Sequence, residues 1–213
     1  KKNELSVIAL SGKSDDEEIA LFLKNGANDF IKKPFSKEEF SCRINNSIEA
    51  LENIQEITNQ AIRDFLTGLY NRRYFFKEAS KYFSSAVQSG ENFAIAMIDI
   101  DHFKKINDTY GHDTGDKAII HLADTLMSET STDDIVARFG GEEFCILLKD
   151  ISSQDAIEAM ERIRKKVQNS VTVSDKGEEI SFNISIGLAT AYENTLDDTV
   201  NEADMHLYTA KES

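Results

Sequence analysis

Two neighbouring parts of the chain carry the clearest hydrophobic pattern, and together they predict the centre of a β-sheet. Residues 93–98 form an unbroken apolar run of the kind found in buried strands, and Asp99 and Asp101 follow it. Residues 136–148 have the pattern of two strands joined at Gly140-Gly141, which is a hairpin signal. We therefore expect three strands in one sheet, with Asp99 at the C-terminal end of the first.

Four carboxylates fall at the ends of these predicted strands. Asp99 and Asp101 end the first strand, and Glu142 and Glu143 occupy the hairpin turn. If the strands pair, like charges meet at one end of the sheet, and each must be solvated or neutralised. A magnesium ion neutralises them at the least cost, because it prefers oxygen ligands and usually completes its shell with substrate phosphates. The pattern therefore points to nucleotide chemistry.

Helical periodicity appears on both sides of these strands in the sequence. It predicts a helix capped by Asn71 and running to about residue 88, and a short helix from Phe103 followed by a polar, glycine-containing loop. Further helices are expected over residues 117–128, 154–169 and 196–211, and further strands over residues 171–173 and 180–187.

The first 63 residues have a pattern of their own. Short apolar runs at residues 7–10 and 29–31 predict two strands with a helix between them. No Gly or Pro occurs between residues 40 and 63, which predicts one continuous helix. Its seven-residue repeat is typical of a dimer stalk; the alternative is a helix packed on its own domain that becomes a plain connector. We expect a first segment, a helical linker and a main domain over residues 1–50, 51–63 and 64–213.

Composition narrows the classes of function. The 213 residues carry a formal net charge of −14, which argues against a general binder of nucleic acid or of acidic membranes. No run of about 18 apolar residues occurs, so no transmembrane helix is expected. Cys42 and Cys145 lie far apart in ordinary amphipathic or apolar contexts. We interpret both as reduced core residues of a cytoplasmic protein.

Residues 5–50 resemble the second half of a response-regulator receiver domain. The match rests on Ser11-Gly12 after the first strand and on Lys33-Pro34-Phe35 after the second. In that family the residues matching Ser11 and Lys33 face the phosphorylated aspartate, and the Lys-Pro bond is typically cis. The resemblance implies a histidine kinase acting on the full-length receiver. The half with the phosphoacceptor lies outside the match, so the segment is either part of a longer receiver or a receiver shortened in evolution.

Five motifs in order carry a second resemblance. They read DFLTGLYNRR at 64–73, DIDHFKKIND at 99–108, GHDTGD at 111–116, RFGGEEF at 138–144 and ADMHLYTAK at 203–211. Together they resemble the GGDEF diguanylate cyclases, in the GGEEF variant. The resemblance implies an α/β fold of the α+β sandwich kind, with a central antiparallel sheet flanked by helices as in nucleotidyl cyclases and polymerase palm domains.

The resemblance also implies an activity, a cofactor and an assembly. The family condenses two GTP molecules into cyclic di-GMP and two pyrophosphates, as a head-to-head homodimer. Two metal ions per active site, Mg²⁺ or Mn²⁺, are expected. The metal ligands implied by the match are Asp99, the Ile100 carbonyl, Glu142 and Glu143. The two glutamates and Lys104 form the implied catalytic set, in which Glu143 either binds the second metal or assists deprotonation of the 3′-hydroxyl.

The implied substrate contacts lie in the other motifs. Asn107 and Asp116 are expected to recognise guanine, because a carboxylate accepts from its two N–H donors and an amide can bind beside it. Lys104 and Lys211 are expected to neutralise the triphosphate, with help from backbone amides near Phe103. Arg138 is expected to orient either the hairpin or the partner's phosphates.

One departure from the family pattern affects regulation. Many members carry Arg-x-x-Asp about five residues before Gly-Gly, as a site for inhibition by the product. Ser131 and Asp134 stand at those positions here, and a serine cannot replace the two contacts of a guanidinium. We predict no product inhibition through that site. Two alternatives to an active cyclase stay open: a non-catalytic module that senses GTP or cyclic di-GMP, and a purely structural dimerisation domain.

Overall fold

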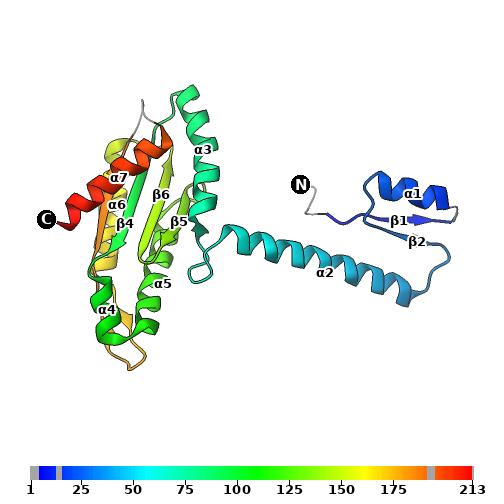
Figure 1. The fold of residues 1–213 in the computed structure, drawn as a ribbon, viewed down its shortest axis with the longest axis horizontal. Coiled ribbons are helices and arrows are strands. Elements are labelled where there is room, and N and C mark those ends of the chain that lie inside the picture. Colours follow the sequence, from blue (N-terminus) through cyan, green and yellow to red (C-terminus); the bar gives the residue numbers. More distant parts are fainter. Residues whose placement is uncertain (1–4, 13–15, 191–194, 213) are drawn as a thin grey trace. The chain divides into compact units, whose positions relative to one another are not determined.

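The fold is taken from a computed structural model that describes residues 5–12, 16–190 and 195–212 (Figure 1). The chain divides into two compact units, residues 1–61 and 62–213. No helix in the described part of the chain is long and apolar enough to cross a membrane.

The first unit contains a small β-α-β arrangement and a long helix. Strands β1 (Ile8–Ser11) and β2 (Asp29–Lys32) pair in parallel and are joined through helix α1 (Asp16–Lys24), as parallel strands require a crossover. The Lys33–Pro34 bond is cis, as expected. Helix α2 (Lys37–Ile62) is continuous, which confirms the helix predicted from residue 40.

The expectation for Cys42 is wrong. It lies on α2, where no residue is fully buried, and it is exposed. The partly covered face of α2 includes the half-buried residues Phe40 and Ile44, and Cys42 lies outside it, which the amphipathic spacing did not reveal. For Cys145 the expected core position and free thiol are confirmed, because this residue is buried in the second unit and forms no disulfide with a described residue.

The second unit is built on a five-stranded sheet with the order β3-β5-β6-β4-β9. Its strands are β3 (Tyr70–Asn71), β4 (Phe93–Ile100), β5 (Ile135–Gly140), β6 (Glu143–Lys149) and β9 (Ile184–Ala189). The β3–β5 pair is parallel and the other pairs are antiparallel. The predicted α/β class is confirmed. The sheet was expected to be antiparallel; it is mixed, because the β3–β5 pair is parallel, although its other strand pairs are antiparallel.

Helices cover both faces of this sheet (Figure 1). They are α3 (Arg72–Ser89), α5 (His112–Glu129), α6 (Ser153–Gln168) and α7 (Leu196–Lys211), and α4 (Phe103–Tyr110) packs against α5 at the end of the sheet (Figure 1). Alternate residues of β4 enter two apolar clusters: Ile98 joins the cluster that includes α5 and α6, and Met97 joins the one that includes α3 and α7. Strand β4 is therefore buried on both sides, which explains its unbroken apolar run.

Two boundaries differ from the prediction. Helix α5 begins at His112 rather than at residue 117, because only Gly111, with φ of 89°, separates it from α4. The predicted strand 180–187 is two strands: β8 (Glu179–Ile180) pairs with β7 (Thr172–Val173), and β9 pairs with β4. The buried ring of Phe182 packs into the core between β8 and β9. The apolar pattern of the sequence therefore continues through the break between the two strands and does not reveal it.

Helix α7 packs against β9 at very short range. A Cβ atom at Gly187 would lie 2.0 Å from the Ala203 carbonyl oxygen and 2.1 Å from the Leu207 nitrogen. The two backbones can approach this closely only because position 187 has no side chain. This contact sets the position of the C-terminal turn of α7, which carries Lys211.

Candidate active site

Strand pairing brings Asp99 and two glutamates to the same end of the sheet. Asp99 lies opposite Glu143 on β6 and opposite Ser185 on β9, so it sits on an inner strand with a neighbour on each side. It is only 4% exposed. Glu142 follows Gly141 in the hairpin turn, where it is half-buried, and Glu143 is exposed. The site therefore combines one buried carboxylate with two that solvent or a ligand can reach.

The buried carboxylate has a cationic partner. Lys211 Nζ lies 2.7 Å from Asp99 Oδ2. Burial raises the pKa of Asp99, Lys211 opposes this rise, and the negative charges of Glu142 and Glu143 add to it. The structure thus places Lys211 on a predicted metal ligand, whereas the sequence assigned this lysine only to the triphosphate.

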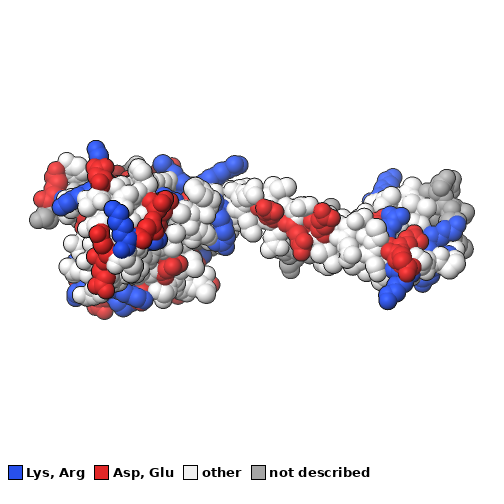
Figure 2. Space-filling view, turned by 90° about the horizontal axis from the view of Figure 1, so that it is seen from below, with Lys and Arg blue, Asp and Glu red and all other residues white. Residues whose placement is uncertain are grey.

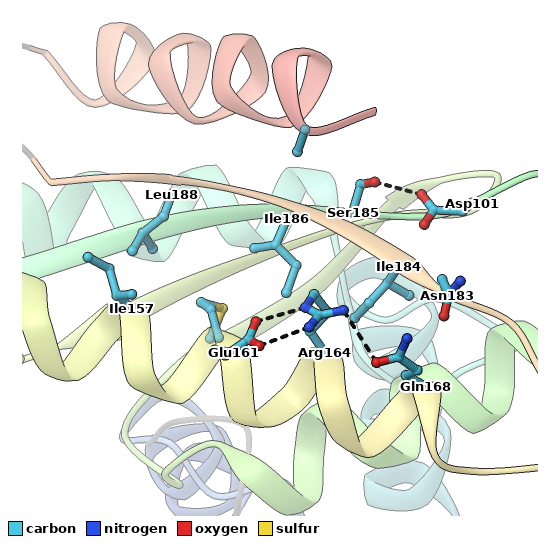
Figure 3. Close-up of a pocket in the computed structure, with 12 residues that line it drawn as sticks. Asp101, Ile157, Glu161, Arg164, Gln168, Asn183, Ile184, Ser185, Ile186 and Leu188 are labelled. Atoms are coloured by element: carbon cyan, nitrogen blue, oxygen red, sulfur yellow. Dashed lines mark hydrogen bonds and ion pairs between the residues drawn. The ribbon is translucent and has the colours of Figure 1, made fainter. Parts of the chain in front are cut away.

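Asp101 is directed toward the edge of the sheet. Its Oδ1 accepts a hydrogen bond of 2.6 Å from Ser185 Oγ. It stands at one end of a groove between α6 and β9, which also contains the ion pair of Glu161 with Arg164 (Figure 3). Asp101 therefore differs in its surroundings from Asp99, although both follow the same apolar run.

The hairpin turn is tied to the loop that opens the second unit. Arg138 donates from Nε and Nη2 to the Gly141 carbonyl oxygen, at 2.9 and 2.7 Å. Its Nη1 donates to both carboxylate oxygens of Asp64, at 3.0 and 3.2 Å. Arg138 thus supports the turn that carries Glu142, which is one of the two roles considered for it.

Asp64 is the residue of this link to which the sequence assigned no role. Its Oδ1 also accepts hydrogen bonds from the backbone N–H and the hydroxyl of Thr67. Burial raises the pKa of Asp64, but the hydrogen bonds from Thr67 and Arg138 outweigh it and lower the pKa below its usual value. Asp64 opens the first of the five motifs, and that position was the only signal in the sequence.

Of the remaining predicted residues, Ile100 ends β4, and the others lie on the two helices that follow it. Phe103, Lys104 and Asn107 are on α4, and Asp116 is on α5, with Lys104 and Asp116 exposed. No side chain caps the first turn of α4, which starts at Phe103. Its first backbone N–H groups are therefore suited to an anion such as phosphate.

The oxygen ligands at the end of the sheet suit magnesium. Within residues 5–12, 16–190 and 195–212, no three His, Cys, Asp or Glu side chains are arranged to hold a metal by themselves. Magnesium is commonly bound through one or two carboxylates, with substrate phosphates completing its shell. The buried Asp99 facing Glu143 across the strand pair provides such a partial site.

Comparison with known proteins identifies the class. The family model described as "Diguanylate cyclase, GGDEF domain" matches residues 61–213. The chain therefore belongs to the GGDEF family of diguanylate cyclase domains.

Matches to two relatives show how far the similarity extends. The chain is 35% identical, over 223 aligned residues, to the response regulator PleD of Caulobacter vibrioides; the match covers 100% of this chain and 49% of PleD. The chain thus spans about half the length of this relative. The GGDEF domain of DgcB from Caulobacter crescentus, solved in complex with c-di-GMP, is 31% identical with a TM-score of 0.69, covering 71% of this chain and 91% of that one. The coiled coil and GGDEF domain of DgcB, also with c-di-GMP, is 28% identical with a TM-score of 0.75, covering 84% and 95%.

Proposed function

We propose that this chain is a diguanylate cyclase that condenses two GTP molecules into cyclic di-GMP and two pyrophosphates. The observation that carries the proposal is the placement of Asp99 opposite Glu143 on adjacent strands, beside the turn with Glu142. Membership of the GGDEF family supports the same reaction. A structural dimerisation domain would not need these carboxylates.

The chemistry consists of two equivalent steps. In each, the 3′-hydroxyl oxygen of one GTP forms a bond to the α-phosphorus of the other, and the bond from that phosphorus to the pyrophosphate oxygen breaks. The hydroxyl proton leaves to Glu143. Asp99, the Ile100 carbonyl, Glu142 and Glu143 would hold Mg²⁺ or Mn²⁺, two ions per site, which would neutralise the triphosphate charge.

Substrate recognition is assigned to α4, α5 and the end of α7. Asn107 and Asp116 bind the guanine edge, and the uncapped start of α4 near Phe103 binds phosphate. Lys104 and Lys211 neutralise the triphosphate, and Lys211 leaves Asp99 to do so. Arg138 acts indirectly, by holding the turn that carries Glu142.

Each domain holds one GTP, so the reaction requires two domains facing each other as a homodimer. We further propose that residues 1–50 derive from a receiver domain and that residues 51–63 serve as a helical stalk for residues 64–213. The 35% identity to the response regulator PleD over the full chain supports this organisation, in which a histidine kinase would act on a complete receiver. The intact mass of the native protein would reveal whether it contains one.

The first test follows cyclic di-GMP and pyrophosphate from GTP and magnesium across a range of protein concentrations. A rate that rises more steeply than the protein concentration supports a dimeric cyclase. Binding of GTP without product at every concentration would replace the proposal with a non-catalytic sensor of GTP or cyclic di-GMP.

Glu143→Gln separates catalysis from binding. The amide keeps the shape of the side chain but cannot accept the proton, so we expect kcat to fall at least about 100-fold while GTP still binds. Glu178→Gln, at an exposed position in the β7–β8 connection, is the matched control and should keep full activity. Normal turnover by Glu143→Gln would contradict the role given to this residue.

A further inference from the structure

Where α4 packs against α5, the side chain of Asn107 fills the space beside Gly115. A Cβ atom at position 115 would lie 1.9 Å from Asn107 Oδ1 and 3.0 Å from its Cγ. The same atom would lie 3.2 Å from Cζ of Phe103. The carboxamide of Asn107 therefore fills the volume that any other residue at position 115 would need.

The glycine is required for space and not for backbone conformation. Gly115 lies inside α5 and is absent from the positions with positive φ, so any residue could adopt its backbone angles. Glycine is also the poorest helix former apart from proline. A buried helical glycine with an ordinary φ is best explained by what lies against it, and here that is the Asn107 amide.

In the structure, the Oδ1 end of the Asn107 amide is the end that faces Gly115. Asn107 Oδ1 is buried and has no hydrogen-bond partner among the described residues. Packing, rather than a hydrogen bond, therefore holds this end of the side chain in place. The Nδ2 donor is the end that a ligand can meet, and the exposed carboxylate of Asp116, one residue beyond Gly115, is an acceptor.

We propose that Gly115 is a positioning residue for base selection, because its missing side chain fixes Asn107 with Nδ2 toward the nucleotide. The inference rests on the proposed function, in which Asn107 and Asp116 bind the base. A donor on Asn107 beside an acceptor on Asp116 matches guanine, which offers two N–H donors next to an acceptor. Adenine lacks these two adjacent donors and is bound poorly by the same pair.

The test compares the affinities of GTP and ATP, with magnesium, for the wild-type chain and for Gly115→Ala, Asn107→Ala and the double variant. Gly115→Ala should reduce the preference for GTP over ATP about 10-fold, because the amide can no longer donate to the base. The double variant should discriminate no worse than Asn107→Ala alone, because both changes remove the same contact.

Stability provides a second readout. The displaced atoms belong to the end of a flexible side chain, so Gly115→Ala should keep an unfolding midpoint close to that of Gly12→Ala, a control with no atom within 4 Å of the added Cβ. If the midpoint falls instead, the double variant should restore it, since the clashing amide is then absent.

The outcomes separate the two proposals. A wild-type chain that does not bind GTP would overturn the proposed function and this inference with it. A wild-type chain that prefers GTP, together with a Gly115→Ala variant that keeps the same preference, would overturn only the role of Gly115. A lowered midpoint that the double variant does not restore would do so as well.

Discussion

At the scale of single residues, the sequence predicted that Asp99 meets Glu142 and Glu143, but not that Asp101 turns toward Ser185 or which residues hold these side chains. Asp99, Glu142 and Glu143 come together because strands and a hairpin have recognisable local patterns. The partners found in the structure are far away in sequence: Arg138 lies 74 residues from Asp64, and Ser185 lies 84 residues from Asp101. No sequence periodicity connects such distant positions, so these contacts could be identified only from the structure.

Asp64→Asn tests the link between the opening loop and the hairpin turn. The ionised carboxylate has a lowered pKa in the folded state, so it stabilises the fold above the unfolded-state pKa of about 4, and this contribution is lost as the pH falls through the folded-state pKa. We expect Asp64→Asn to lower the free energy of unfolding by about 1–3 kcal/mol at neutral pH. Urea titrations at several pH values measure the difference.

The difference between wild type and Asp64→Asn should shrink below about pH 4, where protonation removes the charge of the wild-type carboxylate as well. Asp133→Asn, at an exposed position, is the control and should change little at any pH. A difference that stays constant down to acidic pH would show that the charge of Asp64 does not stabilise the fold.

At the scale of elements, long periodic segments were predicted well and short polar ones poorly. The last helix was expected over residues 196–211 and is found there. The start of α5 was missed because residues 112–116 are polar and include a glycine, which suggests a loop. Burial of Thr114 and Gly115 against α4 overrides that local preference.

The contact between β9 and α7 gives a prediction at this scale. In Gly187→Ala the added methyl group meets the backbone of α7, which cannot move aside as a flexible side chain can. We expect a loss of at least about 2 kcal/mol in the free energy of unfolding, measured by urea titration with circular dichroism. The proposed cyclase activity should fall too, because displacement of α7 would carry Lys211 away from the end of the sheet, where it is proposed to neutralise the triphosphate.

Gly12→Ala, in the first compact unit, is again the control for an added methyl group, because no described atom lies within 4 Å of its Cβ position. It should change the free energy of unfolding by no more than about 0.5 kcal/mol. Equal stabilities of the two variants would mean that α7 does not depend on close approach to β9.

At the scale of the whole molecule, charge and regulation can be considered together. The formal net charge is −14, and acidic and basic side chains are interspersed over the face shown in Figure 2. The composition alone excluded a broad basic surface of the kind nucleic acid requires, and it could not locate the few cations that serve the site. The packing of α7 brings one such cation, Lys211, to the carboxylate of Asp99.

Inhibition by cyclic di-GMP, the product of the proposed reaction, gives the prediction for the whole chain. Ser131 stands where many relatives are expected to carry an arginine, and both oxygens of Asp134 accept hydrogen bonds, from the backbone N–H groups of Ser131 and Lys149. We expect initial rates to show no noncompetitive inhibition by added cyclic di-GMP. Ser131→Arg should introduce inhibition, and strong noncompetitive inhibition of the wild-type enzyme would refute the prediction.

The two crowded glycines differ in how they could change during evolution. At Gly115 the obstacle is a side chain, so loss of Asn107 by mutation would open the position to other residues. At Gly187 the obstacle is backbone, and no single substitution elsewhere removes it. In a lineage that evolves to bind another base, position 107 is therefore expected to change before position 115. Position 187 is expected to stay glycine whichever nucleotide is bound.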